Sequence, residues 1–365
     1  MEQTLGHVTH SQNLRTALGR RTEISATWMP IGYEVRGLER FVPAFAGNWS
    51  VRASLRARNR LARELAHRRH DVLFFHTQVT ALFSTSLMHR VPAVVSLDAT
   101  PINYDSLGAA YRHRPAGGSW LDAKKYRMNK EAFGAARALV AWSEWAAASL
   151  VADYGVPRDR ITVVAPGAAQ LYFRIGEARR PSTDSSRPVR LLFVGGDFAR
   201  KGGYELLEAV TAARTARPFE LHIVTRDAVA PIPRVFVHNG VRPNSTELFK
   251  FFREADVFVL PSHGECLSVA LMEASAARLP LISTPVGALG EAAIHGQTAL
   301  VVPPGDAGSL RGAIEALVDD EALRWRLGDG AHALARVKFD ADRNNEVLLD
   351  LLTAIARPAA AGNAA

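Results

Sequence analysis

Apolar and polar positions form two kinds of pattern along this chain. Short apolar runs alternate with longer segments in which apolar residues recur every three or four positions. Short runs of this kind predict buried strands, and the longer segments predict helices. Strands that alternate with helices favour parallel sheets, so the pattern predicts an α/β fold.

The first half of the chain contains one such series. Strands are expected at Ile24–Met29, Val72–His76, Ala93–Leu97, Ala138–Ala141 and Ile161–Val164. Helices are expected at Ser50–Arg69 and Lys125–Arg137. We therefore predict a Rossmann-like, parallel-sheet domain over residues 1–174.

The start of this domain is unusual. Leu5-Gly6-His7-Val8 has the form of the glycine turn that follows the first strand of a doubly wound domain, yet only Met1 to Thr4 precede it. Either the true start lies upstream, or the domain lacks a central strand. Because a lost central strand would leave a large apolar gap, we favour the first interpretation.

A second series follows a polar stretch. Tyr172 to Pro188 is rich in polar residues and proline, and we place a linker at residues 175–188. Strands are then expected at Val189–Val194, Leu221–Val224, Val235–His238, Val257–Leu260, Leu281–Ser283 and Ala299–Val301. Helices are expected at Gly203–Arg214, Thr246–Glu254, Ser268–Ala277 and Ala307–Val318. These elements predict a second domain over residues 189–340.

The end of the chain has one more helical pattern. Apolar residues recur at helical spacing between Asp340 and Ala356, so we expect a C-terminal helix at 341–357 that packs back on the first domain. Residues 358–365 are rich in alanine and are expected to be a flexible tail. The predicted architecture is two Rossmann-like domains that face a cleft.

Composition is compatible with this division. The 365 residues are 48% hydrophobic and 22% charged, which is enough to bury two cores. Cys266 is the single cysteine, so no internal disulfide can form. No secretory signal and no apolar run long enough for a membrane helix are found, and a cytoplasmic protein is the expectation.

The net charge of +8 is unevenly distributed. Residues 1–175 contain 23 Lys and Arg against 13 Asp and Glu, whereas the remainder contains 21 against 23. The basic residues of the first half include a helical run, namely Arg52, Arg56, Arg58, Arg60, Arg63, Arg68 and Arg69. This run is either a solvated helix face or a surface that attracts an anionic membrane or an acidic acceptor. No basic-aromatic motif accompanies it, so nucleic acid is not an expected partner.

Two carboxylates form the strongest chemical signal. Glu265 lies in a glycine-containing loop after a predicted strand, and Glu273 lies in the following helix. The N–H groups at the start of that helix are expected to make an anion site for a diphosphate, and they belong to Cys266, Leu267, Ser268 and Val269. Glu273 could then accept hydrogen bonds from a ribose diol, and Glu265 could face a sugar.

A structural interpretation of both carboxylates is the alternative. Glu265 could only complement the helix dipole, and Glu273 could be an exposed helical residue. However, Glu273 lies in a nearly apolar helix, where an isolated carboxylate needs a partner. We therefore favour a functional pair.

A glycine-rich loop is the second signal. The predicted strand Val189–Val194 runs into Gly195 and Gly196, and Arg200 and Lys201 follow. Glycine allows the backbone to approach a ligand closely, and Lys201 supplies a point charge for phosphate. The loop alone is weak evidence because it does not match the Walker pattern, but the carboxylate pair downstream strengthens it.

These motifs resemble those of the retaining, GT-B-fold glycosyltransferases of family 4. The similarity lies in two glutamates with seven residues between them, the strand Leu279–Thr284 and the segment Gly296–Asp306, and it is most specific from Phe193 to Asp306. The resemblance implies retention of anomeric configuration, a nucleotide-diphosphate sugar as donor substrate, no cofactor, and Lys201 as a ligand of the donor diphosphate. Many members have Arg where this chain has Gly196, and Arg200 is our candidate substitute.

Further roles are implied by the same resemblance. Asp98 stands where many relatives have a catalytic His, although it could instead cap the following turn. Gly6 and His7 match the glycine loop beneath the sugar and acceptor. Asn239 belongs to a segment that resembles the one holding the base, and Ser143 matches a serine-bearing turn where we expect mainly a helix N-cap. The acceptor is a glycan, lipid or small molecule that the sequence does not identify.

Other functions find less support in the sequence. A nucleotide-sugar epimerase of the same fold and a non-catalytic partner protein remain alternatives, the second because of Gly196, Asp98 and the short N-terminus. A dinucleotide-dependent oxidoreductase lacks its glycine fingerprint. The chain contains no zinc-ribbon cysteines and no metalloprotease histidine pair, so we predict no required metal.

Overall fold

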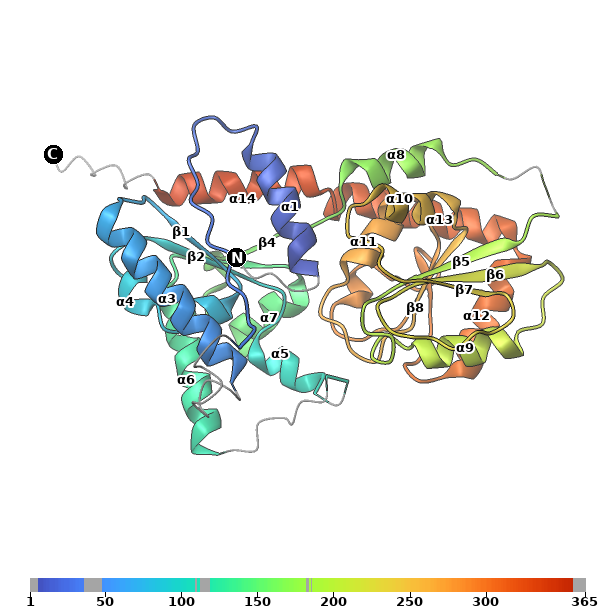
Figure 1. Cartoon of the computed structure of the whole chain (residues 1–365), viewed down its shortest axis with the longest axis horizontal. Helices are drawn as coiled ribbons and strands as arrows, with labels where there is room; N and C mark the ends of the chain where they lie inside the picture. The colour runs from blue at the N-terminus through green and yellow to red at the C-terminus, as the bar shows by residue number, and fades with distance from the viewer. Residues whose placement is uncertain are drawn as a thin grey trace. The chain divides into compact units, whose positions relative to one another are not determined.

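The computed structural model describes residues 6–35, 48–108, 110–111, 119–181, 184 and 186–356. The predictions for Met1 to Thr4 and for the tail at 358–365 lie outside these residues. The described chain forms two compact units (Figure 1). The first takes its residues from the ranges 1–106, 114–164 and 345–365, and the second from 107–113 and 165–344.

The first unit contains a parallel sheet of four described strands in the order β1-β2-β3-β4. The strands are β1 (Leu73–His76), β2 (Ala93–Leu97), β3 (Ala138–Ala141) and β4 (Ile161–Val163). Their positions confirm four of the predicted strands to within one residue. The prediction of a strand at Ile24–Met29 is wrong: this segment is irregular, and it contributes apolar side chains such as Trp28 to the core without pairing to the sheet.

Helices cover both faces of this sheet. They are α1 (Gly6–Leu18), α3 (Trp49–His67), α4 (Thr85–Met88), α5 (Pro101–Ser106), α6 (Trp120–Ala135), α7 (Glu144–Ala152) and α14 (Ala341–Ala356). Neighbouring residues of a strand point to opposite faces, so Val94 and Val95 of β2 belong to different core clusters. Val94 lies in the cluster of Leu14 from α1 and Leu348 from α14. The C-terminal helix therefore packs on the first unit, as predicted.

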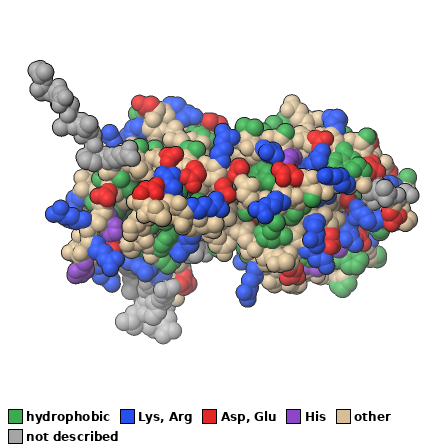
Figure 2. Space-filling model, turned by 90° about the horizontal axis from the view of Figure 1, so that it is seen from above, with side chains coloured by type: hydrophobic (Ala, Val, Ile, Leu, Met, Phe, Trp, Pro, Cys, Tyr) green, Lys and Arg blue, Asp and Glu red, His purple; other side chains and the backbone are tan. Residues whose placement is uncertain are grey.

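The basic run on α3 is partly structural. Arg52, Arg56 and Arg60 are spaced four residues apart, and their guanidinium groups donate hydrogen bonds to backbone carbonyls of residues 30–34. Arg58 and Arg63 remain exposed. On the face of the molecule seen in Figure 2, basic and acidic side chains are interspersed. At least three of the seven arginines thus anchor a neighbouring segment of chain.

The second unit contains a six-stranded parallel sheet in the order β10-β9-β8-β5-β6-β7. Its strands are β5 (Val189–Val194), β6 (Phe219–Val224), β7 (Val235–His238), β8 (Val257–Leu260), β9 (Leu281–Ser283) and β10 (Ala299–Val301). Its helices are α8 (Gln170–Ala178), α9 (Gly203–Ala212), α10 (Thr246–Glu254), α11 (Val269–Ala276), α12 (Ala307–Asp319) and α13 (Glu321–Lys338). All six strands were predicted, and this is the strand order of a doubly wound fold.

The second unit begins earlier than the sequence predicts. Residues 170–178, which fall partly in the first domain and partly in the linker of the sequence division, form helix α8. Tyr172 and Phe173 are buried, and α8 packs against α10 and α11. The polar residues of this segment occupy one face of the helix. The average polarity of such an amphipathic helix is similar to that of a linker, so polarity alone does not separate the two.

No helix in the described part of the chain combines the length and the apolar composition that a membrane span requires.

Candidate active site

The carboxyl ends of β5 and β8 are neighbours in the second sheet. β5 pairs with β6 on one side and with β8 on the other, so the direction of strand succession reverses between β5 and β8. Open parallel sheets bind ligands at such a switch point, outside the carboxyl ends of the strands. The loop after β5 contains Gly195 and Gly196, and the loop after β8 contains Glu265. The tertiary structure therefore brings both predicted motifs to one place.

Two glycines make room for the side chain of Lys201 and for the turn that leads to it. A β-carbon on Gly195 would lie 2.4 Å from Cδ of Lys201. Gly202 has φ of +75°, and a β-carbon there would lie 2.0 Å from the carbonyl oxygen of Pro261. Side chains at these positions would collide with the loop, which explains the glycine-rich sequence.

Glu265 lies between two cations in this loop. Its Oε2 atom is 2.5 Å from Nζ of Lys201 and 3.6 Å from Nη1 of Arg200. Burial by itself raises the pKa of a carboxyl group, but the charges of Lys201 and Arg200 outweigh burial and leave the pKa of Glu265 below its usual value. Glu265 is therefore ionised at neutral pH.

Arg200 is held mainly by the protein itself. Its side chain is 6% exposed, and it donates hydrogen bonds to the carbonyl of Gly264 at 2.5 Å and to Asp197 at 3.0 Å. The guanidinium also lies 4.6 Å from the centre of the Tyr111 ring. These contacts fix the loops after β5 and β8 to each other. Binding of a diphosphate by Arg200 stays a prediction.

The start of α11 faces the same place. Ser268 caps the helix by accepting a hydrogen bond from the N–H of Leu271. Within the described residues, the N–H groups of Leu267, Ser268 and Val269 donate to no protein acceptor. Cys266 is buried next to them, and its carbonyl accepts from the N–H of Ala288. This arrangement has the donors that an anion at a helix N-terminus requires.

Glu273 is buried in the middle of α11. It is 4% exposed and lies beside the Tyr172 side chain of α8. Burial raises the pKa of Glu273 to about 8, although the Tyr172 hydroxyl counteracts part of that rise. The carboxyl is therefore mostly protonated at neutral pH in this structure. Its contact with a ribose stays a prediction.

Asn239 and Gly196 lie at the sheet edge next to β6. The side-chain amide of Asn239 donates to the carbonyls of Thr225 and Asp227, at 2.9 and 3.2 Å. A β-carbon on Gly196 would lie 2.8 Å from the guanidinium of Arg226, which follows β6. The sequence motifs point to Asn239 and Gly196 but not to Arg226.

His7 and Asp98 come together in the first unit. Nε2 of His7 lies 3.9 Å from the carboxylate of Asp98, and Nδ1 lies 3.0 Å from Nε2 of His76. His7 is the second residue of α1, directly after Gly6, and Asp98 directly follows β2. Ser143 accepts a hydrogen bond from the N–H of Ala146 and caps α7, which confirms the expected N-cap.

Three buried aromatic side chains around His7 were not predicted. His76 ends β1 and is fully buried, and its ring stacks on Trp142, which follows β3. His10 lies one helical turn after His7 and contacts the rings of His76 and Trp142. The position of His76 and Trp142 at strand ends, and the helical spacing of His7 and His10, were visible signals in the sequence.

The buried histidines predict a loss of stability in acid. Burial lowers the pKa of His10 to about 3, with a further contribution from His7, and it holds the pKa of His76 well below its usual value. Below pH 6.5 the unfolded chain binds protons at these positions and the folded chain does not, so the free energy of unfolding should fall as pH falls. Each histidine contributes up to about 1.4 kcal/mol per pH unit.

The replacement His10→Phe keeps an aromatic ring and removes one titrating group. In urea titrations between pH 6.5 and pH 4.5, we expect the variant to lose stability less steeply than the wild type. Parallel pH profiles for the two proteins would show that His10 is not buried in its neutral form.

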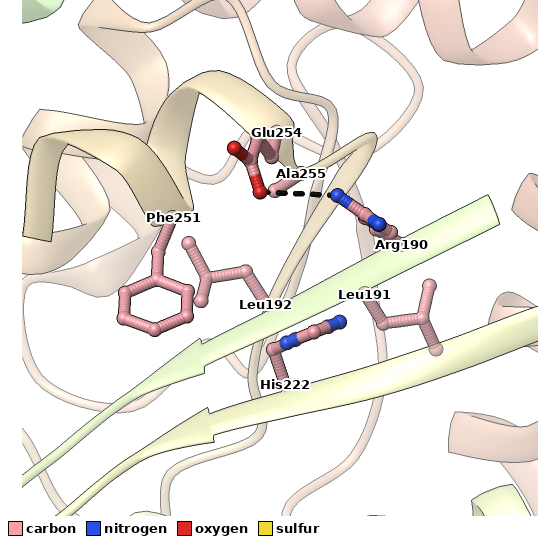
Figure 3. Close-up of a pocket in the computed structure, with 7 residues that line it drawn as sticks. All are labelled: Arg190, Leu191, Leu192, His222, Phe251, Glu254 and Ala255. Atoms are coloured by element: carbon pink, nitrogen blue, oxygen red, sulfur yellow. Dashed lines mark hydrogen bonds and ion pairs between the residues drawn. The ribbon is translucent and has the colours of Figure 1, made fainter. Parts of the chain in front are cut away.

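A hollow on the described surface lies away from the switch point between β5 and β8. The hollow in Figure 3 lies beside α10 and is bordered by the ion pair of Arg190 with Glu254, at 3.1 Å. Arg190 is the second residue of β5, far along the strand from its carboxyl end. Among the described residues, no group of three or more His, Cys, Asp and Glu side chains is placed to hold a metal ion.

Two family models match this chain over both units. The model described as Glycosyltransferase Family 4 matches residues 6–169, and the model described as Glycosyl transferases group 1 matches residues 188–320. The chain belongs to the glycosyltransferases that these two models describe. The match to the second model includes the glycine loop, Lys201, Glu265 and Glu273.

Curated relatives are similar over part or most of the chain. A D-inositol 3-phosphate glycosyltransferase of Pseudarthrobacter chlorophenolicus is 34% identical over 223 residues, which are 54% of this chain and 51% of the relative. A glycogen synthase of Mycobacterium tuberculosis is 29% identical over 311 residues, 80% of this chain and 70% of that protein. The chain thus spans about half the length of the inositol phosphate glycosyltransferase that it matches.

Solved structures with the same fold cover nearly the whole chain. A sucrose-phosphate synthase from Thermosynechococcus elongatus superposes with a TM-score of 0.71 at 16% identity, over 97% of this chain and 94% of that one. An Anabaena protein in complex with UDP-glucose superposes with a TM-score of 0.61 at 16% identity, over 93% and 88%. The two parallel-sheet units are those of the GT-B fold, as predicted.

Proposed function

We propose that this protein is a glycosyltransferase that takes a sugar from a nucleotide-diphosphate donor bound at the carboxyl edge of the second sheet. The observation that supports the proposal most strongly is the convergence of Lys201, Glu265 and the start of α11 at the switch point between β5 and β8. A fixed cation and unpaired N–H groups there stabilise the negative charge that develops on a departing diphosphate.

The donor chemistry follows from the charges of the site. Lys201 contacts the diphosphate, the N–H groups of Leu267, Ser268 and Val269 contact its second phosphate, and the ionised Glu265 orients the sugar hydroxyls. Glu273 accepts hydrogen bonds from the ribose diol. The Anabaena protein of the same fold has UDP-glucose in its structure, which supports a nucleotide sugar as the donor class here.

The finer features of the reaction are proposed on the family resemblance. The reaction retains the anomeric configuration and uses neither a metal nor a cofactor, because hydrogen bonds from Lys201 and the N–H groups stabilise the leaving diphosphate. The acceptor, a glycan, lipid or small molecule, binds the basic first unit near His7 and Asp98. The protein acts in the cytoplasm, with peripheral attachment to anionic membrane through exposed arginines such as Arg58 and Arg63.

Titration calorimetry with UDP- and GDP-sugars and with NAD, in the presence of a chelator, tests the donor site first. We expect selective binding of one sugar nucleotide and no binding of NAD. Product analysis with the donor alone then separates transfer from epimerisation, since an epimerase would convert the sugar in the absence of an acceptor. A folded protein that binds no sugar nucleotide would overturn the proposal.

Replacement of Glu273 by Ala should weaken donor binding about tenfold or more at pH 8.5, where the carboxyl group is largely ionised. A hydrogen bond to a charged group contributes roughly 1.5–3 kcal/mol, and each 1.4 kcal/mol is a factor of ten. Because the pKa of Glu273 is raised to about 8, the wild-type affinity should rise as pH rises from 6.5 to 8.5 and the carboxyl ionises.

Glu273→Gln is the matched control for this effect, since it keeps the shape of the protonated acid and cannot ionise. Its donor affinity should not change with pH over the same range. Wild-type affinity in the Ala variant, measured by calorimetry, would place the ribose elsewhere.

A further inference from the structure

Gly196 stands where many members of the family have an arginine, and the structure shows what occupies the space. A β-carbon built on Gly196 would lie 2.8 Å from Nη2, 2.9 Å from Nε and 3.2 Å from Cζ of Arg226. The guanidinium of Arg226 therefore lies directly over the backbone of residue 196. An ordinary side chain at residue 196 would displace it.

The backbone around Arg226 is fixed to the glycine loop. The N–H of Phe198 donates to the carboxylate of Asp227 at 2.7 Å, which joins the loop after β6 to the loop after β5. From the other side, the amide of Asn239 donates to the carbonyls of Thr225 and Asp227. Arg226 thus comes from a short segment whose backbone is held at both of its neighbours, and this places its side chain at the same edge as Gly196.

Arg226 differs from Arg200 in what surrounds its charge. Arg200 and Lys201 face the two carboxylates of Asp197 and Glu265, so these four groups have no net charge. Arg226 is exposed, and none of the residues that the structure describes forms a hydrogen bond or an ion pair with it. Among the described residues beside the glycine loop, Arg226 is thus a cation with no carboxylate partner.

We propose that Arg226 is the second cation that binds the donor diphosphate, beside Lys201. The inference rests on the proposed function and names a residue for its donor site. A planar guanidinium can make two parallel hydrogen bonds to phosphate oxygens, which Lys201 as a point charge cannot do. Asn239 and Asp227 are then positioning residues, since they hold the backbone of Arg226.

This assignment also explains why the loop has glycine at residue 196 where many family members have arginine. Gly196 leaves open the space in which the Arg226 guanidinium lies, and Arg200 acts as a structural residue between the two loops. An arginine at residue 196 and an arginine at residue 226 would compete for one place. A chain with the first should therefore function without the second.

Calorimetric titration with UDP and GDP, alongside the free nucleosides uridine and guanosine, tests the inference. The proteins are the wild type, Arg226→Ala, Arg226→Ala combined with Gly196→Arg, and Lys201→Ala. Arg253→Ala is the matched control, because Arg253 is an exposed arginine of α10 in the same unit. Thermal unfolding of each variant confirms that it is folded.

We expect Arg226→Ala to weaken binding of the preferred nucleoside diphosphate about tenfold, the size of one charge-assisted hydrogen bond. Binding of the nucleoside should not change, and Gly196→Arg should restore part of the lost affinity. Diphosphate binding by Arg226→Ala within twofold of the wild type, with Lys201→Ala weakened, would overturn the inference and leave the proposed function standing. A wild type that binds neither nucleotide would overturn both.

Discussion

Replacement of Lys201 by Ala is expected to lower kcat/KM at least about a hundredfold, because loss of one preorganised donor to a developing anion typically costs a factor of 10²–10³. Nζ of Lys201 is 2.5 Å from Glu265, so the variant also removes the stronger partner of a buried carboxylate. Steady-state kinetics with the donor identified by calorimetry measures the effect. The pKa of Glu265 should rise in the variant, since burial is then opposed by Arg200 alone.

Lys250→Ala is the matched control for the loss of one lysine. Lys250 is an exposed lysine of α10 whose closest carboxylate oxygen lies 4.0 Å away, on Glu254, and its removal should leave kcat/KM unchanged. Lys201→Ala with kcat/KM within threefold of the wild type would contradict the placement of the donor diphosphate in the glycine loop.

Replacement of Gly202 by Ala is expected to destabilise the second unit by about 2–5 kcal/mol. A non-glycine residue at φ of +75° costs roughly 1–2 kcal/mol, and forcing an extra methyl into a packed site costs about 1–3 kcal/mol more. The added β-carbon would meet the Pro261 carbonyl oxygen, and Gly202 precedes α9 directly. Thermal and urea unfolding of the purified variant measure the loss.

Gly240→Ala separates the two contributions. Gly240 has φ of +80°, but a β-carbon there would meet no atom within 4 Å. This variant should therefore lose only about 1 kcal/mol, because part of the backbone strain is offset by the reduced entropy of the unfolded chain. Equal losses for both variants would show that the contact with Pro261 is relieved by movement of the loop.

The alternation of apolar runs and helical segments was sufficient to predict the two sheets. Ten of the eleven predicted strands are present, because a strand buried on both faces of a parallel sheet leaves a short, nearly continuous apolar run. Ile24–Met29 has such a run and is not a strand, since its apolar side chains reach the core from an irregular segment. Helix α8 was mistaken in part for a linker because its buried residues, such as Tyr172, lie among polar ones.

The candidate site was also predicted only in part from the sequence. Glu265, Glu273, Lys201 and the glycine loop lie in two short segments, so spacing and residue type were enough to select them. The position of those segments beside each other follows from the order of the strands, in which Leu191 of β5 pairs with Val257 of β8, 66 positions later in the sequence. No local pattern contains that pairing.

The sequence by itself determined that this chain is an α/β protein with two parallel sheets, and it selected the short segments in which we place the candidate donor site. Only the tertiary structure decided that Arg226 lies over Gly196, that His10 and His76 are buried neutral against Trp142, and that Arg200 joins two loops. The physical reason is that periodicity and loop composition are local properties of the chain, whereas the partner of a charge is set by which strand ends become neighbours in the folded sheet.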